Sequence, residues 1–314
     1  IFDGNSFTGA GTVTINFQAF CNNFTVTSGV GAGVTFQFNS GLIAGGSINA
    51  TPSANLVWNQ SSALQAANGV TMSRITYTMN SGNIAISGGN LNLNTNTQFT
   101  YNANSTFSHT LSGSGSTITL DGTSKYLHGS NAALNVNGPI TVPSGATFNI
   151  TGNAQKNFNN GGFEMQSGSI GTLTGNWNII NGGFKLHPAG TISYNGGAIY
   201  MQSTVAGTHY IQCGGRNIRR VELNGSNVNA EYRLLDKLIA LNDGLFPYAN
   251  KFITDGHQVN VDNFYAWSST TLTVNLTGTD SLFLMREFRM YPSTTATLIP
   301  GTCTIVWTGA QHQY

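Results

Sequence analysis

The acidic and histidine residues that lie closest together are Asp255, His257 and Asp262. Two carboxylates and an imidazole at such spacing could bind a metal ion or perform general acid–base chemistry. Asp255 is followed by Gly256, however, and Asp-Gly is a common turn dipeptide. We therefore expect these residues at turns and strand edges, with no metal site.

Hydrolysis of a polysaccharide would require two carboxyl groups on either side of the scissile bond. Residues 1–211 contain only Asp3, Asp121 and Glu164 as acidic residues, and these are far apart in the sequence. No nucleophile-elbow, zinc-protease, phosphate-loop or dinucleotide-binding motif occurs in a convincing context. We predict that the chain is not an enzyme and that it binds no cofactor.

Aromatic residues and arginines are mixed in the C-terminal part of the chain. This mixture is typical of binding hot spots and of surfaces on which sugars stack. Burial in a core or in a subunit contact would use the same residue types. The candidate ligand- or partner-binding residues are Tyr265, Trp267, Arg286, Arg289 and Tyr291.

The densest basic cluster consists of Arg216, Arg219 and Arg220. Glu222 and Asp236 are nearby, so we expect cross-strand ion pairs on a solvated face rather than an anion site. The formal net charge is +1, which predicts no nucleic-acid partner. The sequence contains no apolar run of about 18–20 residues, so we expect no membrane insertion.

The elements that must position these residues are short β-strands. Only 7% of residues are charged, 39% are hydrophobic and 39 residues are glycine, a composition that disfavours exposed helices and disorder alike. Apolar and polar residues alternate in short runs between turn residues, which predicts half-buried strands. The runs include 12–17, 34–38, 84–87, 91–95, 117–120, 134–137 and 147–150.

Residues 159–203 contain the clearest repeat, with six apolar segments about 7–10 residues apart. The persistence of this period, and the Gly and Asn at the corners, predict an all-β fold of the β-solenoid class, a β-helix-like stack of short strands. A coil of roughly 22 residues would give around 14 coils. A tandem β-sandwich is the alternative architecture.

The density of charged residues rises after about residue 212. We expect residues 1–211 to form a Gly/Asn/Ser/Thr-rich β-solenoid. Residues 212–314 would form a more charged, β-rich subdomain that continues the same stack. The three cysteines, Cys21, Cys213 and Cys303, are far apart, and we expect them to be buried as small hydrophobic residues.

Three segments of the C-terminal third form a loose repeat: residues 216–225, 235–244 and 252–264. This pattern resembles repetitive phage structural and tail-fibre-like proteins and related secreted bacterial surface proteins. The resemblance covers about half of the chain, and it implies a β-solenoid surface protein without functional residues to transfer. The bulky segment 282–291 departs from the repeat.

The resemblance implies a non-enzymatic structural or adhesive surface protein, above all a bacteriophage virion component such as a tail fibre, spike or decoration protein. A secreted bacterial adhesin or extracellular filament subunit is the alternative. A tailspike-type polysaccharide depolymerase would need clustered carboxylates, which the sequence does not show. The expected location is the virion surface, or the extracellular space or cell surface.

Partners are expected because an open solenoid end exposes unpaired strand edges, which favour aggregation unless they are covered. We expect copies of the chain, or other virion or surface subunits, to cover the solenoid ends. The aromatic and arginine residues make a cell-surface glycan a further candidate partner.

Overall fold

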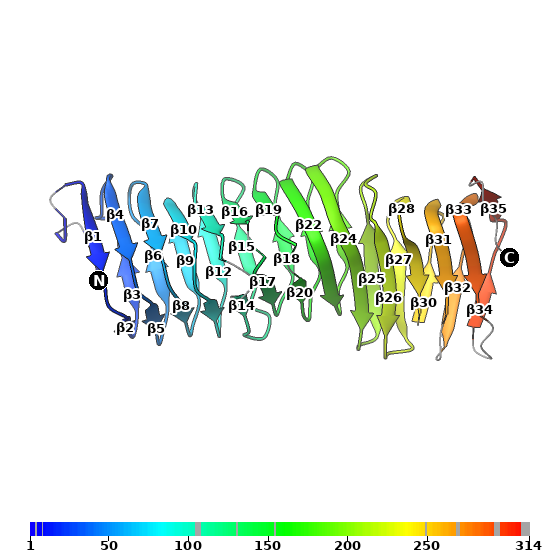
Figure 1. The fold of residues 1–314 in the computed structure, drawn as a ribbon, viewed down its shortest axis with the longest axis horizontal. Coiled ribbons are helices and arrows are strands. Elements are labelled where there is room, and N and C mark those ends of the chain that lie inside the picture. Colours follow the sequence, from blue (N-terminus) through cyan, green and yellow to red (C-terminus); the bar gives the residue numbers. More distant parts are fainter. Residues whose placement is uncertain are drawn as a thin grey trace. The chain divides into compact units, whose positions relative to one another are not determined.

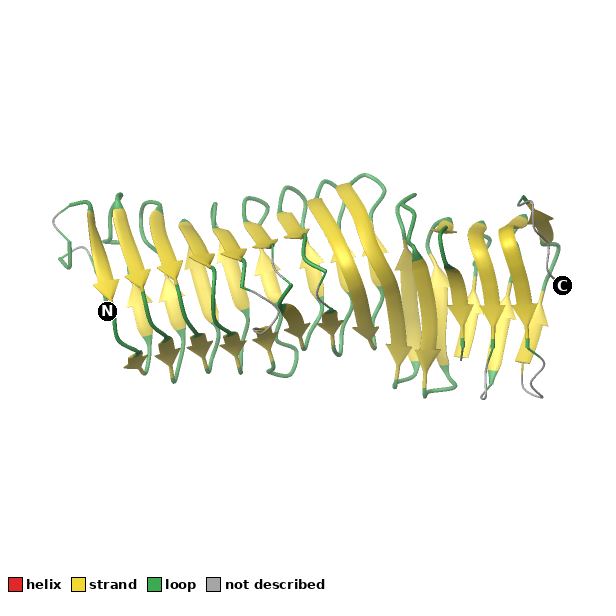
Figure 2. Ribbon diagram, viewed as in Figure 1, coloured by secondary structure: helices red, strands yellow, loops and turns green. Residues whose placement is uncertain are grey.

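The computed structural model describes residues 1–3, 5–7, 9–103, 108–129, 131–153, 155–248, 250–267, 271–291 and 296–308. Within these ranges the chain is all-β without a helix, and parallel strands stack in a β-solenoid of about 13 turns (Figures 1 and 2). The predicted fold class is confirmed. The sandwich alternative is wrong, because a sandwich is built from antiparallel sheets and the strands here pair in parallel.

The chain divides into two compact units. Unit 1 comprises Ile1–Asn157, Ser167–Thr174 and Gly190–Ser193, and unit 2 comprises Phe158–Gln166, Gly175–Ala189 and Tyr194–Tyr314. The boundary predicted at residue 211 rests on the rise in the density of charged residues. The division into units 1 and 2 rests on contacts within the chain, which do not measure charge, so the predicted subdomains stay a prediction.

Each coil of unit 1 contains three short strands, and equivalent strands of successive coils pair in register. Thus β4 pairs with β7, β5 with β8 and β6 with β9. The strands are β1 (Gly11–Ile15), β2 (Ala19–Cys21), β3 (Phe24–Val26), β4 (Val34–Phe38), β5 (Leu42–Ala44), β6 (Ile48–Ala50), β7 (Leu56–Gln60), β8 (Leu64–Ala66), β9 (Val70–Ser73), β10 (Ile75–Met79), β11 (Ile84–Ile86), β12 (Leu91–Asn94), β13 (Gln98–Tyr101), β14 (Ser108–Leu111), β15 (Ile118–Leu120), β16 (Lys125–His128), β17 (Ala133–Val136), β18 (Ile140–Val142) and β19 (Thr147–Ile150).

The alternating sequence places one side chain in two inside the coil. In β4, Val34, Phe36 and Phe38 are buried while the residues between them are half-buried. Aromatic side chains at the inward positions of the first strand of each coil stack on those of the next coil. The rings of Tyr77 and Phe99, for example, have centroids 4.5 Å apart. The coil length varies, since the interval from Phe99 to its partner Tyr126 is longer than that from Trp58 to its partner Tyr77.

Unit 2 uses longer strands and mostly two of them per coil, so that β31 pairs with β33 on one side of the coil and β32 with β34 on the other. Strands β20 (Lys156–Phe158), β22 (Ile170–Ile180) and β24 (Thr191–Ser203) contribute residues to both units. The others are β21 (Phe163–Met165), β23 (Phe184–Leu186), β25 (Gly207–Gln212), β26 (Arg220–Gly225), β27 (Ala230–Leu234), β28 (Leu238–Ala240), β29 (Gly244–Pro247), β30 (Asn250–Ile253), β31 (Val259–Ala266), β32 (Leu272–Asn275), β33 (Ser281–Met290), β34 (Ala296–Ile299) and β35 (Thr304–Trp307).

The six apolar segments of residues 159–203 do not form six strands. Two of them merge in β22 and two in β24. The glycines between the segments predict turns, but Gly175, with φ of 73°, lies inside β22. Because glycine accepts a positive φ without steric cost, the backbone changes direction there while pairing continues.

The departure from the repeat at residues 282–291 does not end the solenoid. This segment lies in β33 and the residue after it, and β33 pairs with β31 and with β35. The register shifts between Val261 and Asn263, so that Met285 and Arg286 lie opposite Asp262 alone. One extra residue in a strand makes a β-bulge, which absorbs the irregular sequence.

Of the three cysteines, only Cys213 is buried, whereas Cys21 and Cys303 are half-buried, so the expectation of three buried cysteines is wrong for two. All three are unpaired. Cys21 pairs with the buried Ala44 and so lies on the inner face of β2, but β5 covers it from one side, which leaves it half-buried. Cys303 lies directly before β35.

The core of unit 1 also contains a chain of polar side chains. His109 Nδ1 lies 2.8 Å from the Tyr126 hydroxyl, which lies 3.2 Å from His128 Nδ1. His128 Nε2 donates to the Ala132 carbonyl at 2.9 Å. Burial lowers the pKa of His128 to about 4 and that of His109 well below its usual range, so both imidazoles are neutral near pH 7.

The buried histidines predict an acid-sensitive stability. As the pH falls from 6.5 toward 4, the unfolded chain binds protons that folded His128 does not, so the free energy of unfolding decreases by up to about 1.4 kcal/mol per pH unit and histidine. Denaturant unfolding between pH 4 and 8 should show a shallower decrease for His128→Gln. His187→Gln, in a half-buried control position, should follow the unmodified chain, and identical curves for His128→Gln and the unmodified chain would contradict the prediction.

Candidate functional site

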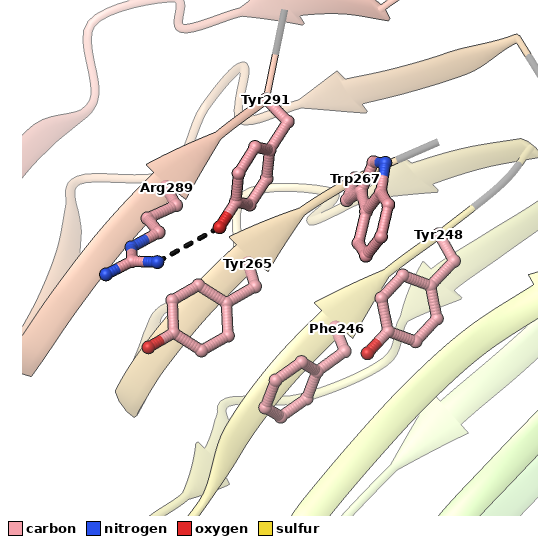
Figure 3. Close-up of a pocket in the computed structure, with 6 residues that line it drawn as sticks. All are labelled: Phe246, Tyr248, Tyr265, Trp267, Arg289 and Tyr291. Carbon is pink, nitrogen blue, oxygen red and sulfur yellow. Dashed lines mark hydrogen bonds between the residues drawn. The ribbon is translucent and has the colours of Figure 1, made fainter. Parts of the chain in front are cut away.

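Four of the five candidate residues lie together in unit 2. Tyr265 lies on β31 with Trp267 just after the strand, and Arg289 lies on β33 with Tyr291 just after it. Phe246 on β29 and Tyr248 after it complete the set. These six side chains line a hollow of about 210 Å³, here called the aromatic hollow (Figure 3).

Register explains why these residues meet. Tyr265 pairs with Arg289, and Leu245 pairs with Phe264, which places Phe246 beside Tyr265. Residues two apart in a strand point to the same side, so three successive coils each present one pair to the hollow. Because strands of neighbouring coils are about 4.8 Å apart, the pairs form two parallel rows. The lower row consists of Phe246, Tyr265 and Arg289, and the upper row of Tyr248, Trp267 and Tyr291.

The lower row has a guanidinium group at both ends. The Phe246 and Tyr265 rings have centroids 5.3 Å apart. The Arg220 guanidinium lies 4.0 Å from the centroid of the Phe246 ring, and that of Arg289 lies 5.5 Å from the Tyr265 ring. Such cation–π contacts stabilise the stack, and Phe246 is only 5% exposed.

The upper row is open to solvent. Trp267 is 60% exposed and Tyr291 is 41% exposed, and their ring centroids are 5.6 Å apart at an interplanar angle of 45°. Tyr248 is half-buried on the preceding coil. In Figure 3 these three rings stand side by side at the same edge of their strands. The upper row, together with the Arg289 side chain of the lower row, which is 44% exposed, is therefore the part of the hollow that a ligand can reach.

A buried carboxylate organises the wall of the hollow. Glu287 is 8% exposed, accepts a hydrogen bond from the Tyr265 hydroxyl, and forms an ion pair with Arg289 Nε. Arg289 Nη1 donates to the Tyr291 hydroxyl at 3.0 Å. Burial, together with the hydrogen bond to Glu287, raises the pKa of Tyr265 to about 12. Tyr265 is thus a neutral hydrogen-bond donor at any physiological pH.

Arg286, the fifth candidate, lies outside the hollow. It sits in the β-bulge of β33, its side chain is 69% exposed, and its Nε lies 3.9 Å from the Asp262 carboxylate. The bulge changes the direction in which Arg286 points relative to Arg289.

Sequence reasoning missed Phe246, Tyr248 and Glu287. The sequence contains a signal for Phe246 and Tyr248. Phe246 precedes Tyr265, and Tyr248 precedes Trp267, by the same interval, which is close to the length of one coil. For Arg220, the sequence predicts only ion pairs on a solvated face. Arg220 does form such pairs, with Glu222 and with Asp243 on the next coil. Its guanidinium group also lies over the Phe246 ring at one end of the lower row.

The acidic and histidine residues of the 255–262 segment are not grouped into a metal site. Asp255 is in a turn with φ of 48° and binds Arg233 at 2.7 Å. The buried Asp262 accepts a hydrogen bond from the Asn242 backbone at 2.9 Å. Among the described residues, no group of three or more His, Cys, Asp or Glu side chains could hold a metal ion.

Comparison with known proteins found no matching family model, no matching curated protein and no matching solved structure. In the described ranges, the chain forms no helix of the length and hydrophobicity needed to cross a membrane.

The exposed aromatic residues of the hollow should be dispensable for folding. We expect Trp267→Ala to change the free energy of unfolding by no more than about 0.5 kcal/mol, since the side chain is mostly in solvent. Phe264→Ala, on the inner face of the same strand, should cost about 3–5 kcal/mol because Phe264 is fully buried against Phe288. Denaturant titration of both variants checks this, and equal losses would show that Trp267 is structural.

Proposed function

We propose that this chain is a non-enzymatic adhesive surface protein that binds carbohydrate in the aromatic hollow. The observation that carries the proposal is the exposed upper row, formed by Tyr248, Trp267 and Tyr291 on three successive coils. Clustered aromatic side chains held in solvent commonly mark a surface that binds a ligand or a partner. The fold buries most of its large rings, and among the exposed ones Trp267 and Tyr291 line a hollow together with Tyr248.

Carbohydrate is the ligand class that the chemistry of the hollow favours. The face of an aromatic ring carries negative charge density, and the C–H bonds on one face of a pyranose carry positive charge density, so the two stack. Sugar hydroxyl groups also need donors and acceptors at the rim. Arg289 and the tyrosine hydroxyls of the hollow supply these.

Binding rather than hydrolysis is supported by the state of the carboxylates. Glycosidases need one free acid and one free base or nucleophile facing the bond. Near the hollow, Glu287 is held by Arg289, while Glu222 and Asp243 are held by Arg220. A carboxylate held in this way is poorly placed to donate or accept the proton of a leaving group.

A parallel stack that presents a binding surface suits a bacteriophage tail fibre, spike or decoration protein, in line with the resemblance of the repeats to such proteins. A secreted bacterial adhesin or extracellular filament subunit has the same requirements. Both place the chain on a virion or outside a cell. In either setting the solenoid is the scaffold and the hollow is the contact with the target surface.

Carbohydrate binding is tested on a glycan array with the purified chain. We expect retention by at least one glycan class, and a loss of affinity of about tenfold or more for Trp267→Ala, which corresponds to about 1.4 kcal/mol. Trp307→Ala, a 40% exposed tryptophan outside the hollow, is the matched control and should bind like the unmodified chain. Binding that survives Trp267→Ala would place the glycan site elsewhere.

Partner chains are a second part of the proposal. Phe17 and Phe20 are 72% and 71% exposed, next to or within strands β1 and β2. Exposed large apolar side chains close to strand edges favour association. We propose that a second copy of the chain, or another virion or surface subunit, covers this coil.

Solution mass tests the partner proposal. We expect the unmodified chain to associate at micromolar concentration and Phe20→Asp to shift the mass toward that of one chain. Val57→Asp places the same charge at a 40% exposed position on β7 and should leave the mass unchanged. A single-chain mass for the unmodified protein at all concentrations would exclude self-association at this coil.

A further inference from the structure

We infer that the aromatic hollow selects uncharged sugars over acidic ones, and that Glu287 sets this preference by neutralising Arg289. The inference rests on the proposed carbohydrate binding and adds the chemical class of the ligand. Its structural basis is the pairing of the cationic groups at the two ends of the lower row.

Arg289 is the only cation among the six residues that line the hollow. Its Nε is paired with the Glu287 carboxylate and its Nη1 donates to the Tyr291 hydroxyl. Glu287 is buried beside Arg289, so its countercharge stays in place although the Arg289 side chain is 44% exposed. An unpaired arginine at this side of the hollow would indicate an anion site. Because Glu287 neutralises Arg289, this side carries no net positive charge.

The other end of the hollow repeats the arrangement. Arg220, which stacks on Phe246, lies 2.5 Å from Glu222 and 3.2 Å from Asp243. Two guanidinium groups thus face three carboxylates around the rings. An acidic sugar would bring a further negative charge to a surface that already has a negative excess, which lowers its affinity.

The groups that remain for a ligand suit hydroxyl groups. Arg289 Nη2 has no hydrogen-bond partner among the described residues, and the Arg289 side chain is 44% exposed. The Tyr248 hydroxyl is 3.5 Å from Arg220 Nη2 and retains its own proton for donation. Trp267 supplies the most exposed ring face. Together they offer one stacking surface and donors at both ends, without an uncompensated charge.

The role of Glu287 in specificity can be isolated by one substitution, because Glu287→Gln removes the negative charge while nearly preserving the shape of the side chain. In Glu287→Gln, the amide oxygen still accepts hydrogen bonds from Tyr265 or Arg289, but the countercharge of Arg289 is gone. Arg289 would then attract a uronate, sialate or sulfate group. Glu222→Gln is the matched control, since Arg220 keeps Asp243 as its partner.

The test uses an array that carries neutral glycans of glucose, galactose, mannose and N-acetylhexosamines beside acidic glycans with uronate, sialate or sulfate groups. We expect the unmodified chain to retain neutral glycans, and Glu287→Gln to raise the ratio of acidic to neutral binding at least tenfold. Glu222→Gln should leave that ratio within about twofold. Trp267→Ala should weaken binding of both classes by about tenfold or more.

A salt titration tests the same inference on the unmodified chain, independently of whether Glu287→Gln folds. Binding of a neutral glycan should change less than twofold between 50 and 500 mM NaCl, because the glycan carries no charge whose attraction salt could screen. A strong loss of binding in high salt would show that an uncompensated charge holds the ligand.

The outcomes separate the two proposals. A preference of the unmodified chain for acidic glycans, lost in Trp267→Ala and weakened by salt, would overturn the selectivity while leaving carbohydrate binding in place. Retention of no glycan at all would overturn the proposed function itself. An unchanged acidic-to-neutral ratio in folded Glu287→Gln would remove the role assigned to Glu287.

Discussion

The parallel hydrogen-bond register between successive coils is the constraint on which the rest of the structure depends. In a parallel stack, each residue lies directly beside the residue one coil away, on both the inner and the outer face. A chemical property repeated once per coil therefore becomes a continuous row. The pairing of Tyr265 with Arg289, one coil later, is one consequence of this rule.

Inside unit 1, the rule converts scattered aromatic residues into a continuous core. Phe99 stacks on Tyr126 with an interplanar angle of 9°, and Tyr126 on Phe148 with an angle of 18°. Burial of rings supplies much of the apolar area of such narrow coils. The two histidines that intrude into this core are tolerated because both hydrogen-bond to a neighbour and remain neutral.

On the outer face of unit 2, the same rule brings together residues that the core does not need. The lower row of the hollow is stabilised by cation–π contacts at both ends, so Phe246 and Tyr265 are ordered by their own neighbours. This leaves Trp267 and Tyr291 exposed on an ordered base. Preorganised rings lose little conformational freedom when a ligand binds, which is the physical advantage of a solenoid as a scaffold for recognition.

The sequence by itself determined the fold class, because alternation of apolar and polar residues and the frequency of turn residues are local properties. It also pointed to Tyr265, Trp267, Arg289 and Tyr291 as residues of interest through their composition. Only the tertiary structure decided that Phe246 and Tyr248 join them, that Arg286 does not, and that Arg289 is neutralised by Glu287. The coils differ in length, and a bulge interrupts the register. Side chains one coil apart therefore cannot be aligned by counting, and only the hydrogen-bond ladder shows which of them meet.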